Sequence, residues 1–406
     1  MQELDADFAT DVLIVGGGFL GLSAALHLSA CGVKVAVLEA MQIGWGASGR
    51  TGGQVIAGLK FDPDELEARY PDRADGLIRL SGEAPRAVYD LVEKYGIQCD
   101  LSKGGWLQPG HSSAAMDTLE LRRRQWEKRG LKSRILDRQE TAKALGCDAY
   151  QGAWLDPRGG NIHPLSYCHG LAGSAIGLGA TIFEQARVEQ LVRNGARWEA
   201  VTSVGHKVVA DQVLVCTNAY SDGLIRGVKG SILAANSFQI ATHPLPPSIG
   251  SAILPSGMAA SDTRKLLLYF RRDAQGRFIL GGRGPFDASK PGAYKTITMA
   301  LHRLYPQLAN EKLEFSWNGK VALTADFLPH YHTPAPGLHV AVGFNGRGVA
   351  LTSAMGLEIG EIILGRGTAE KHPLHAPAVR QIPFPFLKRL YIQSAVAYYR
   401  FRDSVG

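Results

Sequence analysis

The chain has 406 residues, more than a usual single hydrophobic core, so we expect two domains or two closely interwoven ones. Apolar residues make up 45% and charged residues 20%, which is typical of a globular protein and argues against a disordered or fibrous one. The formal net charge is +7, but the basic residues are scattered, which argues against nucleic-acid binding and favours a basic enzyme that attracts anionic substrates.

The N-terminus gives no targeting signal. The first ten residues, MQELDADFAT, are acidic and polar and lack the basic-then-apolar pattern of a signal peptide. The chain contains no run of 18 apolar residues, so no transmembrane helix is predicted. We therefore expect a cytoplasmic protein, and no pattern fixes its oligomeric state.

Residues 11–39 predict a dinucleotide-binding unit. Apolar runs at 12–15 and 33–38 are typical of buried parallel strands, and residues 20–31 carry apolar side chains at helical spacing. Gly16, Gly18 and Gly21 have the G-x-G-x-x-G spacing, which permits a tight turn, close approach of a pyrophosphate and close helix–strand packing. Glu39 follows the second strand, where an acid accepts hydrogen bonds from an adenosine ribose. Further contacts are expected at Phe19, Leu20 and Ala40.

A second glycine-rich segment, GWGASGRTGGQ at residues 44–54, follows directly. A nicotinamide-binding domain would continue here into another helix–strand unit. A loop of small residues instead suits a long cofactor whose pyrophosphate and flavin ring need backbone contacts, so the segment favours FAD. Arg50 either contacts this cofactor or is a solvent-facing loop arginine. The expected contact residues are Ala47, Ser48, Gly49, Arg50, Thr51, Gly52, Gly53 and Gln54.

The next part of the chain is mostly helical. Apolar spacing predicts helices over residues 63–96 and 114–129, with a strand at 104–108 between them. Residues 156–165, DPRGGNIHPL, are too rich in turn residues for regular structure, and a helix is expected over 166–178. His163, at the entrance of that helix, either faces the flavin or is a buried structural residue bonded to backbone.

Further strands are expected near residues 179–183, 188–192 and 208–215. The last of these ends in the small polar segment CTNAYS, the kind of sequence found where a parallel sheet meets a cofactor at its carboxyl edge. Val188, Thr217 and Asn218 are the contacts expected there.

From residue 231 the pattern changes to antiparallel strands. Residues 238–243 form one candidate strand, residues 266–282 a hairpin, and residues 315–324 another strand, with a helix over 293–305. Tyr269 and Arg271 share one face of the first hairpin strand, and Arg283 follows the second. This block is expected to bind the substrate.

A late segment repeats the design of the N-terminus. Residues 338–343 form an apolar strand, a glycine turn follows, and a helix begins near Gly348, with its positive end at the turn. The expected contacts are Gly343, Gly346, Arg347, Gly348 and Val349. We therefore expect a discontinuous cofactor domain of residues 1–85, 150–230 and 330–406, and a substrate domain of residues 86–149 and 231–329. An aromatic, basic helix at 383–402 either docks on the protein or touches a membrane surface or partner.

The cysteines and histidines predict neither a disulfide framework nor a metal site. The five cysteines have no C-x-x-C spacing, and the 12 histidines have neither H-x-x-x-H nor H-E-x-x-H spacing.

Together these motifs resemble the D-amino-acid-oxidase-like FAD oxidoreductases, and within them the γ-glutamylputrescine oxidase group. The resemblance covers essentially the whole chain. It rests on VGGGFLGLSAALHL, GWGASGRTGGQ, GGNIHPL, CTNAYS, the YFRR…GRFILGG hairpin, WNGKVALTADFLPH, GFNGRGVALT and AYYRFRDSVG. It implies an α/β (overall α+β) fold with a discontinuous Rossmann-like FAD domain of the glutathione-reductase-2 type and an antiparallel-sheet substrate domain.

The resemblance also implies a reaction. An amine or amino acid is oxidised to an imine by hydride transfer from its C–N carbon to flavin N5, and O2 usually takes the electrons as H2O2. Backbone N–H groups of residues 346–349 suit negative charge at flavin N1 and O2. Arg271 and Arg283, with Tyr269, are candidates for clamping a substrate carboxylate, and His163 is a further candidate near the flavin. Arg271 is alternatively an exposed hairpin arginine.

Two departures from relatives predict noncovalent FAD. Sarcosine-oxidase relatives attach flavin to a late cysteine, and this chain has none after Cys216. Dimethylglycine-dehydrogenase relatives use a histidine near the first glycine loop, and residues 44–54 contain none. Thr51 and Asn318 stand where many relatives have Asn and Gly, which leaves the local ring contacts open.

Three functions remain open at this point. The first is an amine or amino-acid oxidase. The second is a dehydrogenase on the same scaffold that passes electrons to a quinone or carrier. The third is a partner-binding flavoprotein subunit with structural FAD.

Overall fold

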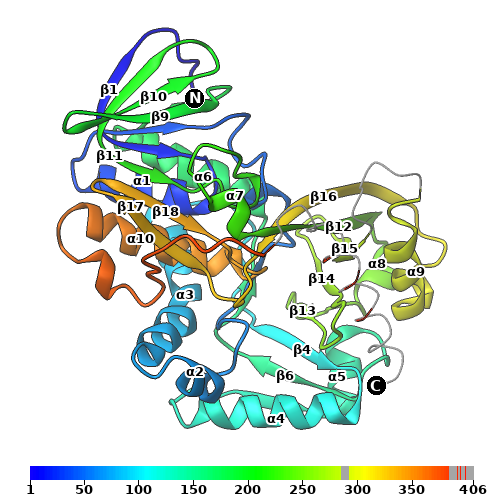
Figure 1. The fold of residues 1–406 in the computed structure, drawn as a ribbon. Helices are drawn as coiled ribbons and strands as arrows, with labels where there is room; N and C mark the ends of the chain where they lie inside the picture. Colours follow the sequence, from blue (N-terminus) through cyan, green and yellow to red (C-terminus); the bar gives the residue numbers. More distant parts are fainter. Residues whose placement is uncertain (285–291, 384–390, 392–393, 395–397, 399–406) are drawn as a thin grey trace.

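The structure, a computed structural model, describes residues 1–284 and 292–383, with the single positions 391, 394 and 398. The fold is built on two large sheets. The long strands β12 and β16 belong to the second sheet, and one end of this pair reaches the side of the molecule where the first sheet lies (Figure 1). The architecture agrees with the predicted combination of a parallel cofactor-type sheet and a largely antiparallel one. The C-terminal helix expected at 383–402 lies outside the described residues.

The first sheet is assembled from three separate stretches of the chain. Its central strands run in the order β17-β18-β11-β1-β2-β8, and every pair from β18 to β8 is parallel. The chain therefore leaves this sheet twice and returns, as the repeated strand–glycine–helix pattern predicts. Its strands are β1 (Phe8–Val15), β2 (Val35–Leu38), β8 (Thr181–Phe183), β9 (Val188–Asn194), β10 (Arg197–Thr202), β11 (Lys207–Val215), β17 (His330–Ala335) and β18 (Leu338–Val342).

Helices α1 (Phe19–Ala30) and α10 (Gly348–Ile363) pack side by side on this sheet (Figure 1). A Cβ added to Gly356 would lie 2.6 Å from the carbonyl oxygen of Leu20, so only glycine allows this approach. Because α1 follows β1 and α10 follows β18, and the two strands run in the same direction, both helices begin at the carboxyl edge of the sheet. This places two positive helix ends at one edge.

The second sheet has the order β16-β12-β15-β14-β13-β4-β6-β5 and is antiparallel apart from the parallel pair β13–β4. It extends beyond the predicted substrate block, because β6 pairs with β4 in this sheet although residues 150–156 were expected in the cofactor part. A small third sheet joins β3 to β7. The strands are β3 (Gln54–Val55), β4 (Trp106–Gly110), β5 (Arg134–Leu136), β6 (Gly152–Asp156), β7 (Gly160–Asn161), β12 (Leu233–Pro244), β13 (Ala259–Ser261), β14 (Tyr269–Arg272), β15 (Arg277–Arg283) and β16 (Leu313–Leu323).

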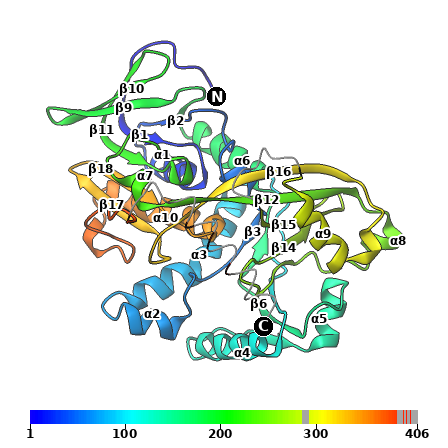
Figure 2. The same cartoon turned by 45° about the vertical axis from the view of Figure 1, so that its right-hand side comes forward.

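The helix expected over residues 63–96 is two helices, which lie below the first sheet (Figure 2). α2 stops at Arg69 because Pro71 follows Tyr70 and proline disfavours helical backbone in the residue before it. No described helix is both long and apolar enough to cross a membrane. The remaining helices are α2 (Pro63–Arg69), α3 (Ala74–Tyr95), α4 (Ser113–Glu127), α5 (Arg138–Leu145), α6 (Pro164–Gly177), α7 (Val228–Ser231), α8 (Pro247–Gly250) and α9 (Lys295–Leu304), with short 3-10 turns η1 (Ser48–Arg50), η2 (Asn218–Tyr220), η3 (Pro306–Leu308) and η4 (Ala369–Lys371).

A buried histidine on β18 makes stability depend on pH. His339 is 6% exposed and lies 2.7 Å from the hydroxyl of Tyr331 and 3.1 Å from Oε1 of Gln212. Burial lowers the pKa of His339 to about 4. Below an unfolded-state pKa of about 6.5 the unfolded chain binds the proton first, so stability falls between about pH 6.5 and pH 4, by up to roughly 3 kcal/mol.

The expected result is a urea midpoint that drops across this pH interval in the wild type. His339→Gln keeps a polar side chain but cannot titrate, so its midpoint should depend less on pH. Equal pH dependence in the two proteins would assign the effect to other groups, such as His332, whose pKa burial also lowers.

Candidate cofactor and substrate site

The turn between β1 and α1 has the geometry that its glycines predict. Gly16 has a φ of +113°, a region that favours glycine, and its N–H donates to the carbonyl of Leu38 at 2.9 Å. A Cβ on Gly21 would lie 2.2 Å from the carbonyl oxygen of Gly16 and 2.9 Å from Sγ of Cys216. Gly18, the N-cap residue of α1, offers no side chain, and Oγ of Ser48 from the next loop accepts only the N–H of Phe19, at 3.0 Å. This helix end can therefore receive an anionic group.

Glu39 lies beside this turn, as its position after β2 predicts. Its carboxylate accepts hydrogen bonds from the N–H groups of Gly17 at 2.7 Å and Met41 at 3.0 Å. Burial raises the pKa of Glu39 more than these bonds lower it. Ala40, the next residue, is exposed. The acid and the first turn of α1 thus form one polar cradle.

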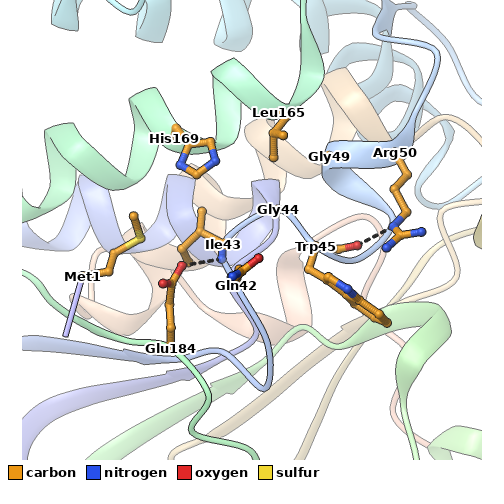
Figure 3. Close-up of a pocket in the computed structure, with 10 residues that line it drawn as sticks. All are labelled: Met1, Gln42, Ile43, Gly44, Trp45, Gly49, Arg50, Leu165, His169 and Glu184. Carbon is orange, nitrogen blue, oxygen red and sulfur yellow. Dashed lines mark hydrogen bonds between the residues drawn. The ribbon is translucent and has the colours of Figure 1, made fainter. Parts of the chain in front are cut away.

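The loop at residues 42–54 is held on both sides. The N–H of Ile43 donates to Glu184 at 2.7 Å, and Nε of Arg50 donates to the carbonyl of Trp45 at 2.6 Å (Figure 3). Nη1 of Arg50 also donates to the carbonyl of Asn318 at 3.2 Å. The guanidinium lies over the Trp45 ring and is partly exposed, so its position in the loop is fixed by contacts within the protein.

A cavity of about 430 Å³ lies beside this loop, and Figure 3 shows the residues that line it. It lies between the loop, α6 and Glu184, and no residue of the second sheet lines it. The residues around it are Met1, Gln42, Ile43, Gly44, Trp45, Gly49, Arg50, Leu165, His169 and Glu184.

The end of the loop is fastened to the second sheet. Nε2 of Gln239 and Nε1 of Trp317 both donate to the carbonyl of Arg50, the latter at 3.1 Å. The N–H of Gly53 donates to Oγ1 of Thr51 at 3.1 Å, and a Cβ on Gly53 would lie 2.1 Å from the carbonyl oxygen of Ile162. Ala47, Ser48, Gly49 and Gly52 are partly exposed along the same loop. Gln239 and Trp317 are not predicted from the sequence, because alternation along a strand does not show which of its two faces meets the cofactor loop.

Gln54 positions the loop with its side chain. It is 8% exposed, its Nε2 donates to the carbonyls of Ala260 at 2.8 Å and Phe270 at 3.2 Å, and its Oε1 accepts from Trp106 at 2.9 Å and Ser261 at 2.6 Å. Only its backbone is therefore left for a cofactor.

Gln54→Leu should destabilise the protein by about 2–4 kcal/mol, because it leaves a buried indole N–H and two carbonyls without their partner. The urea midpoint measures this loss, and the flavin content of the purified variant should fall with it. Ser261→Ala removes one of the four bonds and should cost less. A Gln54→Leu variant as stable as the wild type would contradict this role.

The carboxyl edge of the first sheet brings the later candidates together. Oδ1 of Asn218 accepts from the N–H of Gly343 at 2.9 Å and so joins the end of β11 to the end of β18. Thr217 lies 2.8 Å from Oγ of Ser221. The side chain of Val188 is in the hydrophobic core, which leaves its backbone as the available contact.

The second uncapped helix end is at α10. Gly346 has a φ of +84°, and no side chain caps the helix at Arg347. Nη1 of Arg347 donates to the carbonyl of Ala57 at 3.3 Å, and the guanidinium lies 5.6 Å from the ring centre of Trp106. Burial lowers the pKa of Arg347 to about 10. The arginine therefore turns inward, and the N–H groups from Gly348 and Val349 remain at the helix start.

One face of the second sheet carries the substrate candidates. In the register, Tyr269 is opposite Gly281, Gly281 is opposite Gln239, and Arg283 is opposite Ser237. Cross-strand partners share a face, and residues two apart on one strand do so as well. Tyr269, Arg271, Arg283, Ser237 and Gln239 therefore lie on one side, which we call the site face.

Tyr269 and Arg271 both contact Gly52 of the cofactor loop. A Cβ on Gly52 would lie 2.9 Å from the Tyr269 ring, and Nε of Arg271 donates to the carbonyl of Gly52 at 2.8 Å. The Tyr269 hydroxyl lies 2.6 Å from Oγ of Ser237. Arg271 is 4% exposed, and burial lowers its pKa to about 10. It is therefore no exposed hairpin arginine, and it fixes the loop.

Two polar atoms of the site face have no partner. Nη1 of Arg283 and Oε1 of Gln239 are buried and make no hydrogen bond to any described residue. The side chain of Gln239 is 1% exposed. Burial lowers the pKa of Arg283, and the electrostatic interaction with Tyr269 raises it by less. A buried donor and a buried acceptor without partners are costly unless a ligand satisfies them.

His163 has a structural contact. Its Nδ1 accepts from the N–H of Ser166 at 3.2 Å and so caps α6. Burial, followed by repulsion from Arg271, lowers the pKa of His163. The ring is half-buried, and the cap accounts for its position at the helix entrance.

Lys60 is a charged residue that sequence analysis did not identify. Its side chain is exposed, yet enough protein surrounds it that desolvation, then repulsion from Arg347, Lys265, Arg283 and Arg122, lowers its pKa to about 8. The positive charges that surround Lys60 favour an anionic ligand. In the sequence it lies in an ordinary loop, GLKF, with no signal of this environment.

The comparisons with known proteins show the family to which the chain belongs. A model of the FAD dependent oxidoreductase family matches residues 11–362. The chain is 34% identical to the probable oxidoreductase OrdL of Haemophilus influenzae over 97% of this chain and 92% of that protein. It is 32% identical to the gamma-glutamylputrescine oxidoreductase of Escherichia coli over 100% of this chain and 95% of that protein.

Among solved structures, glycine oxidase from Bacillus cereus matches with a TM-score of 0.75 at 20% identity, over 92% of this chain and 100% of that one. The predicted fold class, the FAD cofactor and the resemblance to D-amino-acid-oxidase-like enzymes are confirmed. The residues present fit FAD, because the N-terminal ends of α1 and α10 lie with an acid at one sheet edge, and neither helix is capped by the side chain of its own N-cap residue. The chain therefore belongs to the FAD-dependent oxidoreductase family.

Proposed function

We propose that the protein is an oxidase of amines that carry a carboxylate, amino acids included, and that it forms an imine and releases H2O2. The observation that carries this proposal is the unpartnered pair on the site face, a guanidinium donor of Arg283 and an amide acceptor of Gln239. A carboxylate satisfies the donor, and an N–H of the substrate satisfies the acceptor. FAD, when bound, supplies the two-electron acceptor for the C–H bond next to nitrogen.

The residues around this pair orient the substrate and keep water out. Tyr269 covers Gly52 of the cofactor loop, and Arg271 fixes the carbonyl of that residue, so loop and sheet keep a constant separation. The positive charge at Lys60, Arg283 and Arg347 attracts a carboxylate and disfavours a protonated amine. A neutral amine is the form that can lose hydride from the adjacent carbon.

We assign the cofactor and the substrate to different sheets. We propose that the first sheet with α1, α6 and α10 holds FAD without a covalent bond through residues 16–21, Glu39, loop 47–54 and residues 343–349. We propose the second sheet as the substrate part. Electrons pass to O2 in this proposal because two relatives of the chain are named as oxidases, a glycine oxidase and a 4-methylaminobutanoate oxidase.

The test is a panel of amines added to the purified holoprotein, with oxygen uptake and peroxide measured. The panel contains γ-glutamylputrescine, putrescine, glycine and an N-methyl amino acid, each with its uncharged amide where one exists. Peroxide release with carboxylate-bearing members supports the proposal. Anaerobic bleaching of the flavin without oxygen uptake, but with reduction of a quinone dye, would indicate a dehydrogenase. A flavin that no amine bleaches would indicate a structural cofactor.

A further inference from the structure

We infer that the C-terminal ends of α1 and α10 form a binding site for one divalent transition-metal ion of the zinc type. The donors are His27 and Cys31 from α1 and Glu361 from α10, and one atom of each lies within 4.8 Å of the other two. This is the one such group of three that a search of the described residues finds. The site is at the opposite ends of the two helices from the cofactor cradle.

The local sequence brings two of the donors to one face. His27 and Cys31 are four residues apart, so both project from the same side of the helix end. The pair is a histidine and a cysteine, so it matches neither the H-x-x-x-H nor the C-x-x-C spacing that marks a metal site in a sequence. The third donor comes from a helix 334 residues later, and only the packing of α1 against α10 brings it close.

Close helix packing holds the histidine ring. A Cβ on Gly360 would lie 2.8 Å from Cδ2 of His27, so the ring rests against the backbone of α10. Nε2 of His27 lies 2.6 Å from Oε1 of Glu361. Imidazole, thiolate and carboxylate form a donor set that suits zinc, with a fourth position for water.

The electrostatics of the position favour a cation. His27 is in the last turn of α1, Cys31 is its C-terminal cap, and Glu361 is in the last turn of α10. The carbonyl dipoles of both helix ends therefore add negative potential at the same place. A cationic group is already drawn there, since Nη1 of Arg366 lies 3.2 Å from Oε1 of Glu361 and 3.9 Å from Sγ of Cys31.

Metal binding replaces this arrangement without a change of fold. The Cys31 thiol loses its proton to solvent and becomes a thiolate ligand, so binding weakens as pH falls. His27 and Glu361 then exchange their mutual hydrogen bond for bonds to the metal. Arg366, whose side chain is 57% exposed, turns to solvent. Arg366 is thus a competitor for the site.

The experiment measures zinc bound per chain in untagged holoprotein by equilibrium dialysis against a chromophoric chelator. The wild type should bind one zinc ion. Cys31→Ser and His27→Gln should each weaken binding at least tenfold, and Arg366→Ala should strengthen it several-fold. Cys147→Ser is the matched control, since Cys147 is in none of the donor groups, and it should bind as the wild type does.

A second measurement does not depend on the folding of the variants. Cys31 is the exposed cysteine, so a thiol reagent should modify it first, and zinc should slow that modification in the wild-type protein. Zinc binding that Cys31→Ser and His27→Gln leave unchanged would overturn the inference. So would the absence of binding to both the wild type and Arg366→Ala, or an unaltered rate of Cys31 modification with zinc.

Discussion

Gly21→Ala is expected to abolish stable FAD binding while a matched glycine substitution does not. The added methyl group would lie 2.2 Å from the carbonyl oxygen of Gly16, 2.9 Å from Sγ of Cys216 and 3.0 Å from Ile14. The first contact is with backbone, so α1 must move away from β1. Overpacking of this kind costs about 1–3 kcal/mol or more, and here the displaced atoms include the helix end that faces the cofactor.

The measurement is the flavin content and FAD dissociation constant of the purified variant, with circular dichroism to verify folding. We expect at least a hundredfold weaker FAD binding. Gly173→Ala is the control, because nothing lies within 4 Å of its added methyl group and it is inside helix α6. Alanine there should be neutral or stabilising by about 0.5–1 kcal/mol. Wild-type FAD affinity in Gly21→Ala would show that the close β1–α1 contact is not required.

The cofactor side of the molecule was largely predictable because its signals are local. The glycine spacing, the acid after β2 and the repeated strand–turn–helix near the end each act within about 30 residues. The parallel pairing of β1 with β2 is what such a strand–helix–strand unit produces. Even the break at Tyr70, which the predicted helix over 63–96 missed, has a local signal in Pro71.

The site face was less predictable because register and burial decide it. The sequence places Tyr269 and Arg271 on the same side of the strand. It does not reveal that Nε of Arg271 donates a hydrogen bond to the carbonyl of Gly52. The sequence also does not show that the side chain of Gln54 forms its hydrogen bonds with the second sheet and not with a cofactor. Arg50 and His163 illustrate the same limit: each is at the expected place, and each side chain has a partner within the protein.

Arg283→Met is expected to raise KM for a carboxylate-bearing substrate and to leave the uncharged amide of that substrate almost unaffected. Nη1 of Arg283 is buried and unpartnered, so a bound carboxylate forms a charge-assisted bond there without further desolvation of the guanidinium. Removing one member of such a buried pair costs about 2–4 kcal/mol, which is roughly a 30- to 1,000-fold loss in kcat/KM. Methionine keeps the length and apolar packing of the side chain.

The ratio of kcat/KM for acid and amide separates recognition from folding, because a damaged fold lowers both values equally. Arg272→Met is the matched control: Arg272 is adjacent to Arg271 on β14 and therefore points to the other face of the sheet, where it bonds to Gly250. It should leave the ratio unchanged. Arg271→Met should differ from both, because it frees the carbonyl of Gly52 and so lowers flavin content first. If Arg283→Met leaves the ratio at its wild-type value, the carboxylate is bound elsewhere, and Lys60 becomes the next cation to test, since its charge lies in the same positive region.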